Sequence, residues 1–173
     1  SELALNEISL LTQKSVGAWV NTPRRMMAWH QQIRKELQGE RPLQITSSGS
    51  LWGLACNGIH YLDLVAWWTG ENLQNIDISG LDSQWIESKR HGFFEITGKI
   101  TADFSGGTNL TLESRLGSAP FNIKVEGQID AWKIEENKGS ATRSDGMILT
   151  GKNEMQSSMT VSYTHLRAHE TRG

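Results

Sequence analysis

The sequence predicts an α+β fold in which an open antiparallel β-sheet is covered by helices on one face. Two observations support this prediction. Residues 26–38 and 54–68 carry apolar side chains at helical spacing, whereas apolar and polar side chains alternate from residue 93 onward. Strands that alternate in this way have one apolar and one polar face. The apolar face of the sheet therefore needs a covering layer, which the helices can supply.

Composition is that of an ordinary globular domain. The chain has 173 residues, a length that suits one domain. A net charge of −2 argues against a nucleic-acid-binding surface, and the longest apolar run, residues 62–68, is too short to cross a bilayer. The single cysteine, Cys56, forms no intrachain disulfide, and the first residues lack the basic segment of a signal peptide. We therefore expect a cytoplasmic protein with neither nucleic-acid nor membrane partners.

The first part of the chain alternates helix and strand. Residues 3–13 predict the end of a helix, and the apolar segment 15–20 predicts a strand buried on both faces. After Pro23, residues 26–38 predict an amphipathic helix that ends at Gly39. Its apolar positions are Met26, Trp29, Ile33 and Leu37. The order of helix, strand and helix is typical of α/β units.

A short strand at residues 43–46 precedes the most informative element, a helix predicted from Leu54 to Trp68 and closed by Thr69 and Gly70. One side of this helix is apolar, with Leu54, Gly58, Leu62, Val65 and Ala66. The opposite side, within an arc of about 60°, carries Cys56, His60, Asp63 and Trp67. Exposed helix faces normally carry Lys, Glu and Gln, so this composition predicts that something specific lies in front of the helix.

The rest of the chain predicts five or six antiparallel strands. Residues 93–104 alternate, a Ser-Gly-Gly turn follows, and residues 110–116 alternate again, which indicates a hairpin. Further strands are predicted at residues 121–125, 129–134 and 147–150. Four side chains are expected to face the covering helices, among them the helix at residues 54–68. They are Phe94, Ile96, Ile100 and Leu112.

Two segments carry a resemblance to a known family. The turn Asn21-Thr22-Pro23-Arg24-Arg25 precedes a helix, and the motif His60-x-x-Asp63 lies on a later helix that leads into a large antiparallel sheet. This order resembles the Gfo/Idh/MocA family of NAD(P)-dependent oxidoreductases over about residues 3–160. The resemblance implies a C-terminal α+β domain that follows the last helix and strand of a truncated Rossmann domain. It divides the chain into a Rossmann remnant (1–22), a substrate and oligomerisation domain (23–160) and a non-native tail (161–173).

The resemblance also implies an activity. Members of the family transfer a hydride between NAD or NADP and a hydroxyl or keto group of a sugar, cyclitol or sugar derivative, and they commonly associate through the open sheet. The family's Gly-rich dinucleotide turn and its Glu-Lys-Pro segment are missing from this chain. We therefore expect a homo-oligomeric parent enzyme, and a chain that neither binds NAD(P) nor acts alone. The alternative is a non-catalytic open-sheet module for dimerisation or carbohydrate binding.

The family's motif carries over to a few residues. His60 matches the histidine that assists proton transfer from the substrate hydroxyl, and Asp63 matches the aspartate that follows it. An imidazole suits this role because its pKa lies near the working pH. The family's acid four residues before the histidine is replaced by Cys56, with Asn57 beside it, so altered chemistry is possible.

Three side chains are candidates for substrate binding: Arg25, Asn57 and Trp52. Arg24 and Arg25 follow a strand end, where α/β proteins bind ligands, and we expect one of the two to be functional and the other to be solvated. Trp52 could stack on a sugar ring or belong to the core.

Structural roles compete with each of the functional ones. His60 could be a buried histidine bonded to a backbone carbonyl, and Asp63 could orient the imidazole or face solvent. Cys56 could be a small buried apolar residue. Three ligands on one helical stripe make a poor metal site, so no metal is expected.

The last residues, 161–173, resemble translated sequencing-adapter DNA. The alternative is a metal-binding tail, since His165 and His169 are four residues apart. We favour the first interpretation and leave the segment out of the fold prediction.

Overall fold

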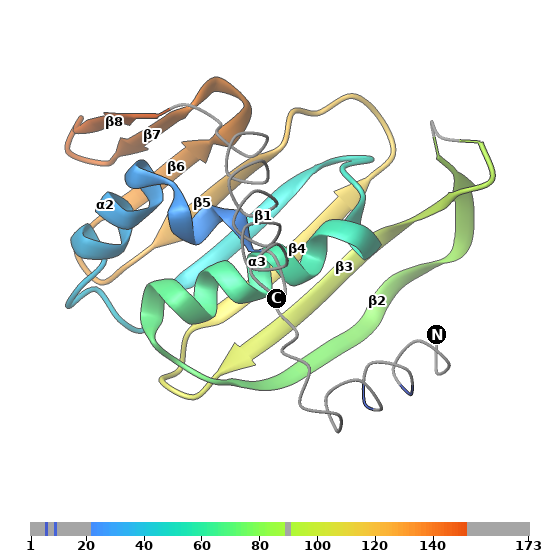
Figure 1. Ribbon diagram of the computed structural model, residues 1–173, viewed down its shortest axis with the longest axis horizontal. Helices are drawn as coiled ribbons and strands as arrows, with labels where there is room; N and C mark the ends of the chain where they lie inside the picture. Colours follow the sequence, from blue (N-terminus) through green and yellow to red (C-terminus); the bar gives the residue numbers. More distant parts are fainter. Residues whose placement is uncertain (1–5, 7–8, 10–21, 89–90, 152–173) are drawn as a thin grey trace, which may run out of the picture.

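The computed structural model describes Asn6, Ser9 and residues 22–88 and 91–151 (Figure 1). The predicted strand at residues 15–20 and the tail at 161–173 lie outside the described residues. So does the helix predicted at 3–13, apart from Asn6 and Ser9, which are helical. The proposed Rossmann remnant at 1–22 and the boundary at residue 160 therefore stay predictions.

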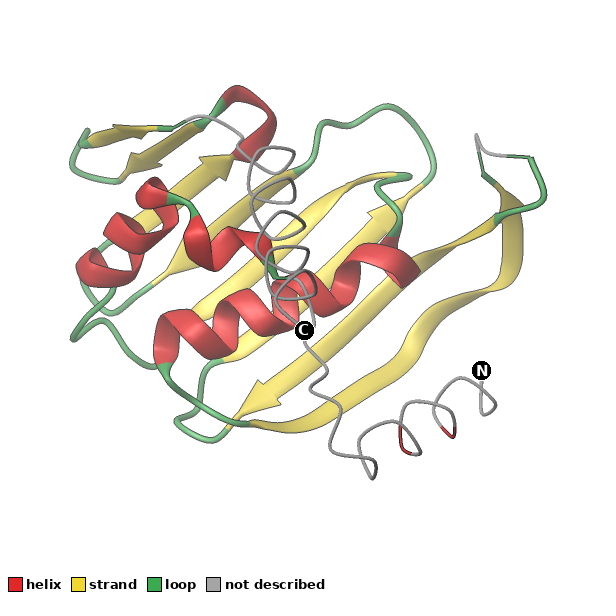
Figure 2. Ribbon diagram, viewed as in Figure 1, coloured by secondary structure: helices red, strands yellow, loops and turns green. Residues whose placement is uncertain are grey.

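The described residues form an eight-stranded sheet with helices on one face (Figure 2). The helical segments are η1 (Pro23–Met26), α2 (Ala28–Glu36), α3 (Leu54–Thr69) and η2 (Glu136–Lys138). The strands are β1 (Gln44–Ser50), β2 (Leu73–Glu87), β3 (Phe94–Phe104), β4 (Asn109–Arg115), β5 (Asn122–Glu126), β6 (Ala131–Glu135), β7 (Ser140–Arg143) and β8 (Ile148–Thr150). The predicted α+β open sheet is confirmed, with β2 and β7 as strands that the alternation did not predict.

The sheet has the strand order β2-β3-β4-β1-β5-β6-β7-β8. All neighbouring strands are antiparallel except β1 and β4, which run parallel. Because β2, β3 and β4 alternate in direction, β2 runs parallel to β1. Parallel strands need a long crossover connection, and α3 supplies it by crossing over β3 and β4. The crossover places α3 against the apolar face of the sheet (Figure 1).

Helix α3 packs through a face that is displaced from the predicted one. Leu54, Gly58 and Val65 are buried as expected, but Leu62 and Ala66 are only half-buried. The other buried side chains are Tyr61, Leu64, Trp68 and Thr69. A Cβ atom at Gly58 would lie 3.4 Å from Leu112 Cδ1, so glycine lets the helix approach the sheet closely. The helix ends at Gly70 in the left-handed conformation (φ 71°), as the sequence predicts.

Helix α2 begins two residues later than predicted. Trp29, Ile33 and Leu37 are buried in the core. Met26 is wrongly assigned to that face: it is 72% exposed because it ends η1, and the extended backbone at Met27 separates the two segments.

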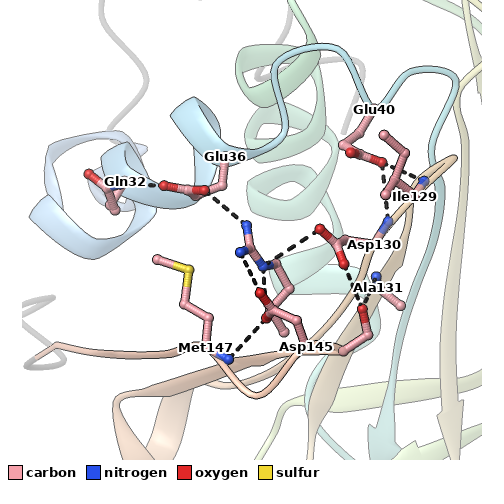
Figure 3. Close-up of polar contacts among 10 residues, drawn as sticks. Gln32, Glu36, Glu40, Ile129, Asp130, Ala131, Asp145 and Met147 are labelled. Atoms are coloured by element: carbon pink, nitrogen blue, oxygen red, sulfur yellow. Dashed lines mark hydrogen bonds and ion pairs between the residues drawn. The ribbon is translucent and has the colours of Figure 1, made fainter.

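An ion-pair cluster holds α2 against the far end of the sheet (Figure 3). Arg143 at the end of β7 donates to Glu36 of α2 at 3.1 Å and to Asp145 at 2.6 Å. The Asp130 carboxylate lies 3.6 Å from the same guanidinium group. Within residues 22–88 and 91–151, none of the helices is both long and apolar enough to cross a bilayer.

The predicted inward side chains are confirmed at the centre of the sheet and wrong at its end. Leu112 is 1% exposed, Ile100 packs against the core and Ile96 is half-buried. Phe94 is 60% exposed. It pairs only with β2, because Gly98 is the first residue of β3 that pairs with β4. Figure 1 shows this two-stranded extension leading away from α3, so α3 does not cover it.

Candidate active site

Two adjacent arginines of η1 contact opposite sides of the candidate site. Consecutive residues of a 3₁₀-helix are about 120° apart, so Arg24 and Arg25 point in different directions. Arg24 is 6% exposed. Its Nε and Nη2 atoms donate to the Glu136 carboxylate at 2.7 and 2.9 Å, and Nη2 also donates to the Tyr61 hydroxyl at 2.8 Å. Arg24 therefore has a structural role, and solvation, which was expected for one of the two arginines, is wrong for Arg24.

Glu136 is the centre of this buried network. The Tyr61 hydroxyl donates to its carboxylate at 3.0 Å, and His30 Nε2 lies 3.0 Å from its Oε1 atom. Burial alone would raise the pKa of Glu136, but the hydrogen bonds from His30 and Arg24 lower it to about 2. Burial and the neighbouring carboxylate raise the pKa of Tyr61, which keeps its hydroxyl protonated. One charged carboxylate thus joins η1, α2, α3 and η2.

Arg25 holds Asp63. Its Nε atom donates to Asp63 Oδ2 at 2.8 Å, and its Nη2 atom donates to Oδ1, so both carboxylate oxygens are engaged. The Arg25 side chain is 41% exposed and the Asp63 side chain 19%. The spacing of three residues on α3 predicted Asp63 to orient His60 or to face solvent. The structure shows a third arrangement, in which Asp63 is the partner of Arg25.

His60 lies on α3, half-buried, one turn after Cys56. Its Nδ1 atom is inaccessible to solvent and has no hydrogen-bond partner among the described residues. Burial, followed by the positive charge of Arg24, lowers the pKa of His60, and Asp63 and Glu136 oppose this effect. The environment of His60 therefore favours the neutral form of its imidazole. The described residues offer it no backbone carbonyl partner, contrary to the structural alternative.

Trp52 and Asn57 shape the start of α3. The Asn57 amide donates to the Trp52 carbonyl at 2.7 Å, and Trp52 Nε1 donates to the Glu113 carbonyl at 2.7 Å. The Trp52 ring packs edge-on against Tyr61 at 5.5 Å and lies 5.0 Å from Phe121. These contacts hold the segment before α3 against the helix and the sheet. Contact of Trp52 and Asn57 with a substrate stays a prediction.

Cys56 is exposed, so the interpretation of a small buried residue is wrong. It lies on the side of α3 away from the sheet, and the neighbouring Ala55 and Ile59 are exposed as well. In the part of the chain that the structure describes, no group of three or more His, Cys, Asp or Glu side chains is placed to hold a metal ion. His165 and His169 lie outside that part.

Sequence reasoning missed Glu136, His30 and Tyr61. Glu136 follows Arg24 by 112 residues and His30 by 106, and it comes just after the strand predicted at residues 129–134, so its local pattern points to neither partner. Tyr61 adjoins His60, yet the predicted apolar face of α3 did not include it.

Solved structures share this architecture, whereas no family model and no curated protein matches the sequence. UDP-N-acetylglucosamine 3-dehydrogenase GnnA from Acidithiobacillus ferrooxidans matches 97% of this chain and 58% of its own at 12% identity (TM-score 0.62). A putative NADPH-dependent oxidoreductase from Desulfitobacterium hafniense matches 83% of this chain and 52% of its own at 10% identity (TM-score 0.56). The fold is that of the Gfo/Idh/MocA C-terminal domain.

A super-repressor mutant of Gal80p from Saccharomyces cerevisiae has the same fold. It matches 88% of this chain and 51% of its own at 10% identity, with a TM-score of 0.61. The chain spans about half the length of the solved structures it matches. At these identities the likeness concerns the fold, and the Gfo/Idh/MocA-like domain of this chain must be interpreted from its own residues.

Proposed function

We propose that this chain supplies the substrate-binding half of an NAD(P)-dependent oxidoreductase, in which His60 exchanges a proton with a hydroxyl or keto group. The observation that carries the proposal is the state of His60. Its imidazole is half-buried, its pKa is lowered, and its Nδ1 atom has no hydrogen-bond partner among the described residues. Because Nδ1 is closed to solvent, we infer that the proton is exchanged at the other ring nitrogen, Nε2.

The residues of this chain fit the reacting end of a nicotinamide cofactor better than its phosphates. His60 can take or return the substrate's proton, while the sequence has no Gly-rich turn to cradle a dinucleotide. NAD(P), when bound, supplies the hydride acceptor or donor. We infer that its phosphates are held by residues outside this chain. The part of this chain is to position the substrate, shield it from water and exchange the proton.

The proposed substrate is a sugar, cyclitol or sugar derivative. Trp52 lies with Phe121 and Tyr61 near the start of α3, and a stacked aromatic ring suits the apolar face of a sugar. Asn57 and Arg25 are the candidate polar contacts: Asn57 bonds to the Trp52 carbonyl, and Arg25 uses its Nε and Nη2 atoms for Asp63. One structural neighbour is described as a dehydrogenase of UDP-N-acetylglucosamine, which supports this substrate class.

A non-catalytic module is the second candidate function. Cys56 occupies the position at which the resemblance implies an acid, and a Gal80p variant described as a super-repressor shares the fold. Loss of the acid would suit a binding domain that keeps the shape of the site without its chemistry.

An assay of the protein that contains this chain distinguishes the two. The absorbance of reduced nicotinamide is followed with a panel of sugars, cyclitols and nucleotide sugars. We expect turnover with at least one of them, and His60→Ala should lower kcat about 10²-fold or more while nucleotide affinity is unchanged. The matched control is His91→Ala, since the His91 side chain is 99% exposed. Absence of turnover with every substrate, or an undiminished rate in His60→Ala, would support the module instead.

A further inference from the structure

The Arg25–Asp63 ion pair lies beside His60. Asp63 follows His60 by three residues on α3, a spacing at which two side chains on a helix are neighbours. A carboxylate close to an imidazole favours the charged form of the ring. Here both Asp63 oxygens accept from Arg25, and Nδ1 of His60 has no hydrogen-bond partner among the described residues.

Arg25 reaches Asp63 from a turn that is fixed on its other side. The preceding residue, Arg24, is held in the interior by Glu136 and Tyr61. The Arg25 carbonyl accepts a hydrogen bond from the Gln31 amide at 3.1 Å, and its amide donates to the Thr22 carbonyl at 3.4 Å. The geometry of the ion pair is therefore set by the fold of η1, because the exposed end of the arginine alone would not restrain it.

Few charges act on His60. Arg24 acts from η1, Glu136 acts from η2, and Asp63 lies on α3 itself; Arg25 of η1 contacts Asp63. Tyr61 beside it is a protonated hydroxyl, and the position one turn earlier holds Cys56. The strands under α3 present uncharged side chains, among them Ile100 and Leu112. Asp63 is therefore the anion on the same helix as His60, and its charge opposes the lowering of the His60 pKa by burial and by Arg24.

We propose that Arg25 is a positioning residue, which engages both oxygens of Asp63 and so keeps that carboxylate from hydrogen-bonding to His60. The inference rests on the proposed function for its chemical meaning, since a free neutral imidazole is what a proton acceptor requires. It assigns the ion pair a role beyond stability. A half-exposed ion pair contributes little to folding, about 1 kcal/mol or less.

The test is an NMR titration of His60 in the chain with isotopically labelled histidine. Arg25→Met frees Asp63, and we expect the pKa of His60 to rise by about one pH unit. Arg25→Lys keeps the charge but cannot engage both oxygens, so the rise should be smaller. Arg34→Met is the control. It removes a cation of α2 that lies over the Trp67 ring, and it should leave the titration of His60 unchanged.

The double variant shows whether Arg25 acts through Asp63. In an Asp63→Asn background, Arg25→Met should shift the His60 titration by less than half as much as it does alone. An equal shift in both backgrounds would mean that Arg25 acts by its own charge, and no shift in either would make the pair purely structural; both results overturn the proposal. Should Arg25→Met fail to fold, as judged by circular dichroism, Arg25→Lys decides alone, because an unchanged titration overturns the proposal there too.

This experiment needs neither nucleotide nor turnover. If the pKa of His60 rises in Arg25→Met as expected but the protein has no dehydrogenase activity, the ion-pair proposal stands and the proposed function is excluded. Turnover that depends on His60, combined with an unmoved titration in Arg25→Met, would do the reverse.

Discussion

Replacing Glu136 by glutamine should destabilise the domain strongly. Arg24 would remain 6% exposed with its countercharge gone, and breaking a buried ion pair in this way costs about 3–5 kcal/mol. The carboxylate itself gives a similar figure. Its pKa falls from 4.5 to about 2, which corresponds to roughly 3 kcal/mol at about 1.4 kcal/mol per pH unit. Since small domains are stable by only about 5–15 kcal/mol, such a loss is readily measured.

Urea unfolding followed by tryptophan fluorescence measures this loss. The rings of Trp29 and Trp68 lie 4.4 and 5.6 Å from the ring of His30, so they report on the network directly. The matched control is Glu135→Gln. Glu135 precedes Glu136 and pairs with Lys133 and Lys138 at the surface, so its loss should cost less than about 1 kcal/mol.

A loss below about 1 kcal/mol for Glu136→Gln, or equal losses for both variants, would refute the electrostatic argument. The double variant Arg24→Met/Glu136→Leu adds a second test. Apolar side chains of similar size leave no unpaired charge, so much of the lost stability should return. A double variant less stable than Glu136→Gln would show that packing, and not charge, dominates at this position.

Three further predictions concern acid, nucleotide and assembly. The pKa of Glu136 is lower in the folded state than in the unfolded one, so its contribution to the free energy of unfolding is complete above about pH 4.5 and is lost as the pH falls toward 2. Denaturation curves over this range should show that loss in the native chain and not in Glu136→Gln. Calorimetry of the chain alone should detect no NAD(P) binding, because the phosphate-binding turn is missing, and micromolar affinity would contradict this. Light scattering of the longer protein should give a dimer or higher oligomer that associates through the open sheet face, which carries Lys99, Glu113, Arg115 and Lys124; a monomer mass would exclude that interface.

Local patterns predicted much of the fold. The helix at α3 and the strands β3 to β6 follow from the period of their apolar residues, which is set by contact with one buried layer. Strand β2 has no such period, because its side chains are exposed along almost its whole length and its register shifts three times against β3. The central place of β1 was equally hidden, since it depends on a parallel pairing with β4 that only the α3 crossover creates.

The candidate site was predictable in its residues and not in its contacts. His60, Asp63 and Arg25 were all expected, but spacing on one helix suggested that Asp63 would serve His60. An arginine 38 residues earlier takes the carboxylate instead, and local spacing cannot reveal such a competitor. The same holds for Glu136. Its three buried partners are distant in the sequence, so the local pattern around Glu136 does not predict them.

The pH dependence of turnover by the longer protein tests the central claim most directly. If His60 accepts the substrate's proton, kcat/KM for alcohol oxidation should fall as the pH drops through the lowered pKa of His60, below about 6.5. His60→Gln should lower kcat/KM about 10²-fold or more and abolish that inflection. A His60→Gln protein that keeps both the rate and the inflection would contradict the assignment of His60 as the proton-transferring residue.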